Sequence, residues 1–307
     1  MKAIVVGAVE STKIAVKCVA ASPKWDLAAV FTLPPDLSGR HSDFVDLAPD
    51  AERAGTQIVR TANINSDAAL QAIREMEPDY IFVIGWSQIC GEQFRATATK
   101  GVVGYHPAPL PRLRGRAVIP WTILLDEPIS ASSLFLIDEG VDSGPLLGQR
   151  YFHLAPDETA ATLYAKHMAK LEEMLPEVLE DIASGSPTLL VQDERCATYA
   201  ARRRPEDSLI DWAQPASAVW RCVRACGDPY PGAWTNFGED RIVIEAAAPV
   251  PLGHHAAALA GQIVERGEGG FTVKCGDDQG LFVSRWRTAR EKPLPNHAIL
   301  GQPRAAA

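Results

Sequence analysis

The sequence predicts an α/β protein in which a doubly wound, mostly parallel sheet is followed by a small β-barrel. Two features of the first part predict the sheet. Short apolar segments alternate with helical patterns, and the segment 79–85, DYIFVIG, is apolar on both faces, as a central parallel strand requires. A third feature predicts the barrel, because short strand-like segments separated by glycine turns follow Leu209.

The expected elements of the first part alternate regularly. Strands are expected over 2–7, 28–32, 57–60 and 79–85. Helices are expected from about Ile14, over 44–54 and over 66–77, where Ser66 is a suitable N-cap. The turn after the first strand, GAVEST, lacks a GxGxxG fingerprint, so a nicotinamide enzyme is not predicted. Ligands of such sheets bind beyond the carboxyl ends of the strands, so the segment 85–88 is a candidate pocket wall.

The central stretch, 101–144, combines a proline-rich loop with an acidic turn. The loop, YHPAPLPRLRG, holds the lone His106, and the turn, IDEGVDSG, holds Asp138, Glu139 and Asp142. Apolar segments lie between them over 118–125 and 131–137. Such loops are usually surface features placed by a rigid scaffold. His106 and Asp142 can meet only if the fold brings them together.

The remaining elements predict a second, smaller domain. A strand over 148–153 and a helix from 156 to about 183 precede a charged stretch containing Arg202, Arg203 and Arg204. After it we expect a helix over 215–225, strands near 233–236, 241–246, 261–265, 271–275 and 281–285, and a poorly ordered tail beyond Pro293. The predicted division is therefore 1–190, a linker over 191–208, and a second domain over 209–307.

Composition excludes several classes of protein. The formal charge of −8 over 307 residues argues against nucleic acid as the main partner, since phosphate binding needs a basic surface. The six cysteines show no CxxC spacing, so neither a disulfide framework nor a metal site is expected. No apolar run is long enough for a signal peptide or a membrane span. We therefore expect a soluble cytoplasmic protein.

The central stretch carries a resemblance to a known family. GYHPAPLPRLRGRAVIPW followed by IDEGVDSGPLL resembles the 10-formyltetrahydrofolate-dependent formyltransferases, which include methionyl-tRNA formyltransferase, glycinamide ribonucleotide formyltransferase and the sugar N-formyltransferases. TYAARRRPEDSLIDWAQPASAVWRCVRACGDPYPGAW is similar to the linker and C-terminal domain of the formyltransferase that acts on nucleotide-linked 4-amino-arabinose. The resemblance thus covers nearly the whole chain. It implies a Rossmann-like domain that binds the folate and an OB-like C-terminal barrel.

The resemblance also assigns the reacting groups. His106 and Asp142 match the family's catalytic histidine and aspartate, whereas the asparagine two residues before the histidine falls on Gly104. Formyl transfer needs donors for the developing oxyanion, and a protonated His106 is suited to this role. Asp142 would favour the charged histidine or accept the amine proton. Gln88 is our preferred replacement for the missing asparagine, because its amide has the same donor chemistry.

The predicted binding residues follow from the resemblance and from the expected edge of the sheet. No metal is required, and 10-formyltetrahydrofolate is the expected formyl donor. The folate is expected to contact Trp86, Ser87, Gln88, Ile89, Leu113, Ile137, Asp138, Glu139, Gly140 and Asp142. The acceptor is expected to contact Pro107, Arg116, Arg202 and Arg203, since guanidinium groups suit phosphate oxygens. A solvated linker is the alternative for the arginine pair.

These residues lead to one preferred function and two alternatives. The preferred function is formyl transfer to the amine of a nucleotide-linked amino sugar. The resemblance links this reaction to one-carbon metabolism and to lipopolysaccharide modification. A homodimer is compatible with it. The first alternative is formylation of methionyl-tRNA, which would need an electropositive surface. The second is a folate-binding pseudoenzyme, suggested by Gly104.

Overall fold

The computed structural model describes residues 1–253, 257–290 and 292–301. The chain divides into two compact units. The first comprises Met1–Val118, Ile129–Leu154 and Tyr164–Ala201, and the second comprises Ile119–Pro128, Ala155–Leu163 and the chain from Arg202 onward. Over the residues so described, no helix is both long and apolar enough to cross a membrane.

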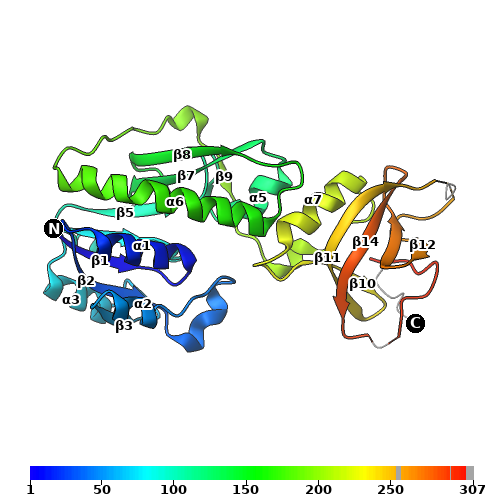
Figure 1. The fold of residues 1–307 in the computed structure, drawn as a ribbon, viewed down its shortest axis with the longest axis horizontal. Helices are drawn as coiled ribbons and strands as arrows, with labels where there is room; N and C mark the ends of the chain where they lie inside the picture. Colours follow the sequence, from blue (N-terminus) through cyan, green and yellow to red (C-terminus); the bar gives the residue numbers. More distant parts are fainter. Residues whose placement is uncertain (254–256, 291, 302–307) are drawn as a thin grey trace. The chain divides into compact units, whose positions relative to one another are not determined.

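The first unit is built on a seven-stranded sheet with the strand order β3-β2-β1-β4-β5-β7-β8 (Figure 1). The first five of these strands are parallel neighbours, whereas β7 and β8 add an antiparallel edge. The predicted mostly parallel sheet is therefore confirmed. The strands are β1 (Lys2–Val6), β2 (Asp26–Thr32), β3 (Gln57–Arg60), β4 (Tyr80–Val83), β5 (Gly101–His106), β7 (Ile129–Leu136) and β8 (Leu146–His153).

Helices cover both faces of this sheet, as expected for a doubly wound fold. Successive strand residues point to opposite faces, and they divide between two core clusters. Val5, Val30 and Phe82 belong to one cluster, together with residues of the helices α1 (Glu10–Ala21), α2 (Ala48–Arg53) and α6 (Ala160–Ala183). Ile4 and Ile81 belong to the other, together with residues of α3 (Asp67–Met76) and α4 (Glu92–Arg95). The predicted cap of α3 is present, since Ser66 Oγ accepts a hydrogen bond from the Ala69 amide.

One strand next to the site was not predicted. We expected Tyr105 and His106 to belong to a proline-rich loop over 105–115 and assigned no strand before it, but the structure pairs 101–106 as β5 between β4 and β7. His106 is the last residue of β5 and pairs with Ser133 of β7. Because β4 and β5 are parallel, the carboxyl end of β5 lies at the same edge of the sheet as the segment that follows β4. The fold therefore places His106 where a ligand of a doubly wound sheet is expected.

Short elements complete the first unit and the connection to the second. They are the 3-10 helices η1 (Pro35–Arg40), η2 (Glu194–Cys196) and η3 (Pro205–Ser208) and the two-residue strands β6 (Arg114–Gly115) and β9 (Tyr199–Ala200), which pair in parallel. The predicted linker, 191–208, is thus divided between the units, because its first part pairs with the proline-rich loop of the first unit.

The second unit contains an antiparallel five-stranded sheet and confirms a separate β domain. Its order is β10 (Ala233–Phe237), β11 (Asp240–Pro251), β14 (Gln279–Thr288), β13 (Gly270–Lys274) and β12 (Ile263–Gly267). Most of α5 (Val118–Leu124) and all of α7 (Ala216–Cys226) also belong to this unit.

The C-terminal tail is more ordered than the sequence suggested. Leu294, Ala298 and Leu300 are buried. The backbone amide of Ile263 donates to Ala298 O, and that of Leu300 donates to Gly261 O, both at 2.8 Å. Apolar residues near the end of the chain therefore pack on the second unit. The rest of the predicted tail, 302–307, lies outside the described residues.

Candidate active site

His106 and Asp142 lie together at the carboxyl edge of the sheet. The distance from His106 Nδ1 to Asp142 Oδ2 is 3.6 Å, and the side chains are 7% and 22% exposed. This distance exceeds that of a direct hydrogen bond. The two side chains are therefore neighbours that do not share a direct hydrogen bond.

The His106 ring is oriented by the loop that follows it. Its Nε2 lies 2.7 Å from Leu113 O. A carbonyl oxygen only accepts, so Nε2 carries the hydrogen and Nδ1 is the nitrogen that faces Asp142. Leu113 has a left-handed backbone, with φ of 59°, which is costly for a branched residue. Its amide donates to Thr198 Oγ1 at 2.9 Å, which helps to hold this conformation.

Asp142 is held by its own turn and by the same loop. Its φ is 51°, a left-handed conformation that aspartate tolerates better than most residues. Its Oδ2 accepts a hydrogen bond of 2.8 Å from the Gly115 amide. A glycine is needed at 115, because φ is 107° and a Cβ would lie 2.6 Å from Ala200 O. The carboxylate is therefore fixed in place before any substrate binds.

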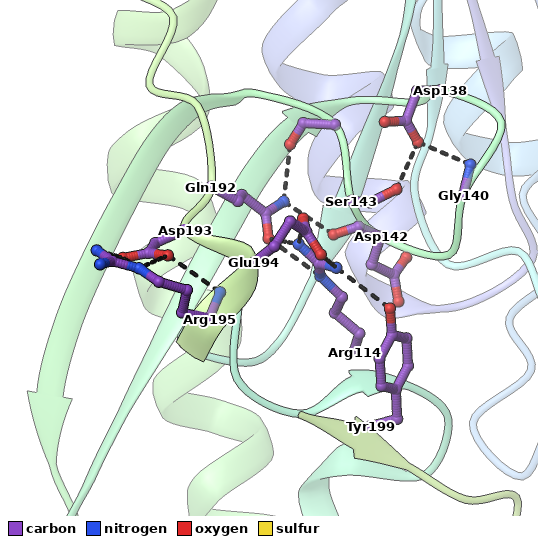
Figure 2. Close-up of polar contacts among 11 residues, drawn as sticks. Arg114, Asp138, Gly140, Asp142, Ser143, Gln192, Asp193, Glu194, Arg195 and Tyr199 are labelled. Carbon is purple, nitrogen blue, oxygen red and sulfur yellow. Dashed lines mark hydrogen bonds and ion pairs between the residues drawn. The ribbon is translucent and has the colours of Figure 1, made fainter. Parts of the chain in front are cut away.

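A buried arginine, Arg114, lies between Leu113 and Gly115, the two residues that contact His106 and Asp142; Figure 2 shows its side chain with Asp142. The Arg114 side chain is 0% exposed and makes a two-pronged ion pair with Glu194, with distances of 2.9 and 2.7 Å. Its Nε and Nη2 also donate to Gln192 Oε1, and its Nη1 donates to Tyr199 Oη. The hydrogen bond with Glu194 raises the pKa of Arg114 and holds the pKa of Glu194 below its usual value. Arg114 therefore ties together segments far apart in sequence.

The acidic turn is partly self-supporting. Asp138 Oδ1 accepts hydrogen bonds from the Gly140 amide at 3.0 Å and from Ser143 Oγ at 2.8 Å (Figure 2). This arrangement gives Asp138 a role in shaping the turn, while Glu139 is exposed. Folate contacts of Ile137, Asp138, Glu139 and Gly140 stay predictions.

The segment after β4 lies at the same edge. Trp86 and Ile137 both pack against the core cluster on the α3 side of the sheet, whereas Ser87 and Ile89 are exposed. The indole Nε1 of Trp86 is buried and has no hydrogen-bond partner among the described residues. This edge thus combines apolar surface with polar groups, which is the usual make-up of a small-molecule site.

The structure gives the Gln88 amide partners other than His106. Its Nε2 donates to Ala62 O at 2.7 Å, and its Oε1 accepts from the Ile64 amide at 3.1 Å. Both ends of the amide thus fasten the segment that follows β3. Gln88 would have to exchange these bonds to act as an oxyanion donor, so its catalytic role stays a prediction.

The two roles of Gln88 can be separated by mutation. Because two hydrogen bonds are lost, we expect Gln88→Ala to lower the free energy of unfolding by about 1–3 kcal/mol, with kcat changed less than about tenfold. Chemical denaturation and steady-state kinetics would measure the two effects. A fall in kcat of about 10²-fold with unchanged stability would instead identify Gln88 as the oxyanion donor.

Gly104 is enclosed by apolar side chains. It lies two residues before His106 on β5, so both positions face the same side of the sheet. A Cβ at Gly104 would lie 2.7 Å from Phe135 Cζ and 3.0 Å from Ile137 Cγ1. The ring of Phe135, from the paired position on β7, thus fills the space that a side chain at 104 would need. The position to which the resemblance assigns an asparagine therefore holds a glycine, and the neighbouring side chains of Phe135 and Ile137 occupy the space beside it.

On the opposite face of β5, a polar group is kept neutral. His167 of α6 is fully buried, and its Nδ1 lies 3.0 Å from Ser132 Oγ. Burial, together with a smaller effect of the positive charge of His106, lowers the pKa of His167 to about 3. His167 therefore stays uncharged at neutral pH.

The predicted acceptor-binding residues differ in their surroundings. Pro107 is half-buried and Arg116 is exposed, with its amide donating to Ala200 O. Arg202 is exposed, and its side chain makes no hydrogen bond or ion pair among the described residues. Arg203 instead donates to Asp207 O and to Cys226 Sγ, and its guanidinium lies 5.1 Å from the ring centroid of Trp121. Of the two arginines, Arg202 is thus exposed to solvent, whereas the Arg203 side chain is bound within the protein.

Three residues that support the site were missed from the sequence. Gln192, Glu194 and Thr198 lie in the predicted linker, yet each contacts the loop that carries His106 or the turn that carries Asp142. No local pattern marks them, because their partners are 48 to 85 positions away.

Comparison with known proteins identifies the family of the chain. Residues 1–179, more than half of the chain, match the family described as formyl transferase, and residues 203–303 match the formyl transferase C-terminal domain.

Solved structures share the fold. An N-formyltransferase from Helicobacter canadensis, in complex with folinic acid and dTDP-3-aminofucose, is 17% identical with a TM-score of 0.68, covering 92% of this chain and 99% of its own. HypX from Aquifex aeolicus, in complex with tetrahydrofolic acid, is 17% identical with a TM-score of 0.65, covering 95% of this chain, which spans only 45% of HypX. Methionyl-tRNA formyltransferase from Clostridium thermocellum is 18% identical with a TM-score of 0.58, covering 81% of this chain and 93% of its own. The two matched domains and the shared fold place the chain, a transferase, in the formyltransferase family.

Proposed function

We propose that the chain transfers a formyl group from 10-formyltetrahydrofolate to the amine of a nucleotide-linked amino sugar. The observation that carries the proposal is the pairing of His106 with Asp142 at the carboxyl edge of the sheet, 3.6 Å apart. Two of the similar structures contain tetrahydrofolic or folinic acid, which supports a folate donor.

The proposed reaction is a direct acyl transfer. The amine nitrogen attacks the formyl carbon, so a new C–N bond forms and the carbonyl oxygen gains charge. The bond from the formyl carbon to folate N10 then breaks, N10 gains a proton, and the new amide nitrogen loses one. His106 carries the Nε2 hydrogen toward Leu113 O, so Nδ1 is the atom that holds or moves a proton at the reacting centre. Asp142 accepts the amine proton.

The acceptor is inferred from similarity and charge. The Helicobacter canadensis enzyme contains a nucleotide-linked amino sugar, and nearly all of its length is covered by this chain. The net charge of −8 disfavours a long polyanion such as tRNA. A nucleotide diphosphate needs only a few cationic side chains, such as the exposed guanidinium of Arg202.

A panel of acceptors tests the proposal. The protein would be incubated with 10-formyltetrahydrofolate and either amino-sugar nucleotides or methionyl-tRNA, and formylated products would be detected by mass spectrometry. Formylation of an amino-sugar nucleotide is expected. Formylation of methionyl-tRNA alone would refute the acceptor, and folate binding without turnover on any amine would indicate a pseudoenzyme.

The arginine pair provides a second test of the acceptor. Arg202→Ala removes an exposed cation, so we expect the KM for the sugar nucleotide to rise about tenfold, the usual value of one charged hydrogen bond. Folate affinity and thermal stability should be unchanged. Arg203→Ala, which also removes the contacts to Asp207, Cys226 and Trp121, should lower the melting temperature. A loss of folate affinity in Arg202→Ala would show that this arginine does not serve the acceptor.

A further inference from the structure

We propose that Gln192, held in place by Arg114, is a positioning residue that sets the geometry of Asp142 and, with the adjacent loop, of His106. The inference rests on the proposed function, because its first readout is turnover. Gln192 does not itself react, and it lies in the segment 191–208 that we predicted to be a linker.

All hydrogen-bonding groups of the Gln192 side chain are in use. Oε1 accepts from Arg114 Nε at 3.2 Å and from Arg114 Nη2 at 2.9 Å. Nε2 donates to Asp142 O at 2.8 Å and to Gly144 O at 2.7 Å. An amide turned by half a rotation would place its NH₂ against a guanidinium and its oxygen against two carbonyls, so one orientation alone is favourable.

Several hydrogen bonds hold the Arg114 side chain in one position, so its contacts also fix the position of Gln192. The guanidinium is completely buried and is bound by both oxygens of Glu194 and by the Tyr199 hydroxyl (Figure 2). Two-pronged pairs of this kind fix direction as well as distance. Because Arg114 keeps the pKa of Glu194 below its usual value, the ion pair is complete above the ordinary glutamate pKa and is lost only when pH falls through the lowered one. The anchor is therefore intact at neutral pH.

Two hydrogen bonds hold Asp142, and both depend on the short strand β6. Gln192, which is bound to Arg114, donates to the backbone carbonyl of Asp142, and the amide of Gly115 donates to its carboxylate. The residue before Arg114, Leu113, accepts the His106 hydrogen bond. Residues 113–115 therefore set both members of the pair, and Gln192 connects them to the acidic turn.

Gln192→Glu is the sharpest test, because it changes only the donor end of the side chain. The carboxylate retains the pairing with Arg114 but presents an oxygen to the carbonyls of Asp142 and Gly144. We expect kcat to fall about tenfold or more, the usual cost of a small misplacement of reacting groups, while the KM for 10-formyltetrahydrofolate changes less than about threefold. The pH profile of kcat should shift as well. Gln192→Met, which lacks both charge and donor, serves if the glutamate variant folds poorly.

Arg195→Gln is the matched control. Arg195 lies on the same segment but is 89% exposed, and it pairs with Asp193 outside this network (Figure 2). Its kcat and pH profile should equal those of the wild type. The ring signals of labelled His106 in NMR spectra provide a readout that needs no turnover, and they should move in Gln192→Glu but not in Arg195→Gln.

The outcomes separate the two proposals. A wild-type protein that formylates no acceptor contradicts the proposed function, but the NMR comparison still tests the positioning role. Folded Gln192→Glu and Gln192→Met variants with wild-type kcat and unmoved His106 signals would overturn that role and leave the function intact.

Discussion

Replacement of His106 by alanine is expected to lower kcat by about 10²-fold or more. Nδ1 of the imidazole lies 3.6 Å from Asp142 Oδ2, while Nε2 is bound to Leu113 O. One oxyanion donor or acid–base group usually contributes at least this much. The KM for the folate should change little, since the ring is 7% exposed and offers little binding surface. Single-turnover measurements of formyl transfer would isolate the chemical step.

Replacement of Asp142 by asparagine should have a comparable effect. The asparagine oxygen can still accept the hydrogen bond of the Gly115 amide, so the turn is retained while the charge is removed. His153→Ala is a suitable control, because His153 is an exposed histidine at the end of β8. Turnover like that of the wild type in His106→Ala or Asp142→Asn would refute their assignment as the reacting pair.

The parts of the fold that depend on local pattern were predictable. The β4 segment is a continuous apolar run, and α3 shows both an apolar stripe and a serine cap, so each could be recognised without its partners. β5 was not recognised, because its glycines and its single histidine resemble the start of the proline-rich loop. It is a strand because β4 and β7 pair with it on both sides, and this information is not local.

The site was predictable to the same extent. Motifs mark His106 and Asp142 in the sequence, whereas the hydrogen bonds of Gln192 join it to a turn 48 to 50 positions away. Gln88 was placed at the correct edge, but a sequence cannot show that its amide is used by Ala62 and Ile64. Chemistry that depends on which hydrogen bonds are already made can be read only from the structure.

Gly104→Asn is expected to destabilise the protein without raising its activity. A Cβ at this position would lie 2.7 Å from Phe135 Cζ, so the ring or the strand must move, at a usual cost of about 1–3 kcal/mol for overpacking. The amide would enter a pocket lined by Phe135 and Ile137, and an unsatisfied buried polar group costs about 1–3 kcal/mol more. We therefore expect a loss of about 2–6 kcal/mol in the free energy of unfolding, measured by urea denaturation.

A double-mutant cycle identifies the cause of this loss. Gly104→Ala should lose only the overpacking part, and Phe135→Leu combined with Gly104→Asn should recover stability, because the shorter side chain leaves space for the amide. If Phe135 is the obstacle, the coupling between the two substitutions will be favourable. Wild-type stability together with a raised kcat/KM in Gly104→Asn would mean that the site has lost a catalytic asparagine. The expected result means instead that β5 and β7 are packed around a glycine, and that any other donor to the formyl oxygen must come from elsewhere at this edge of the sheet.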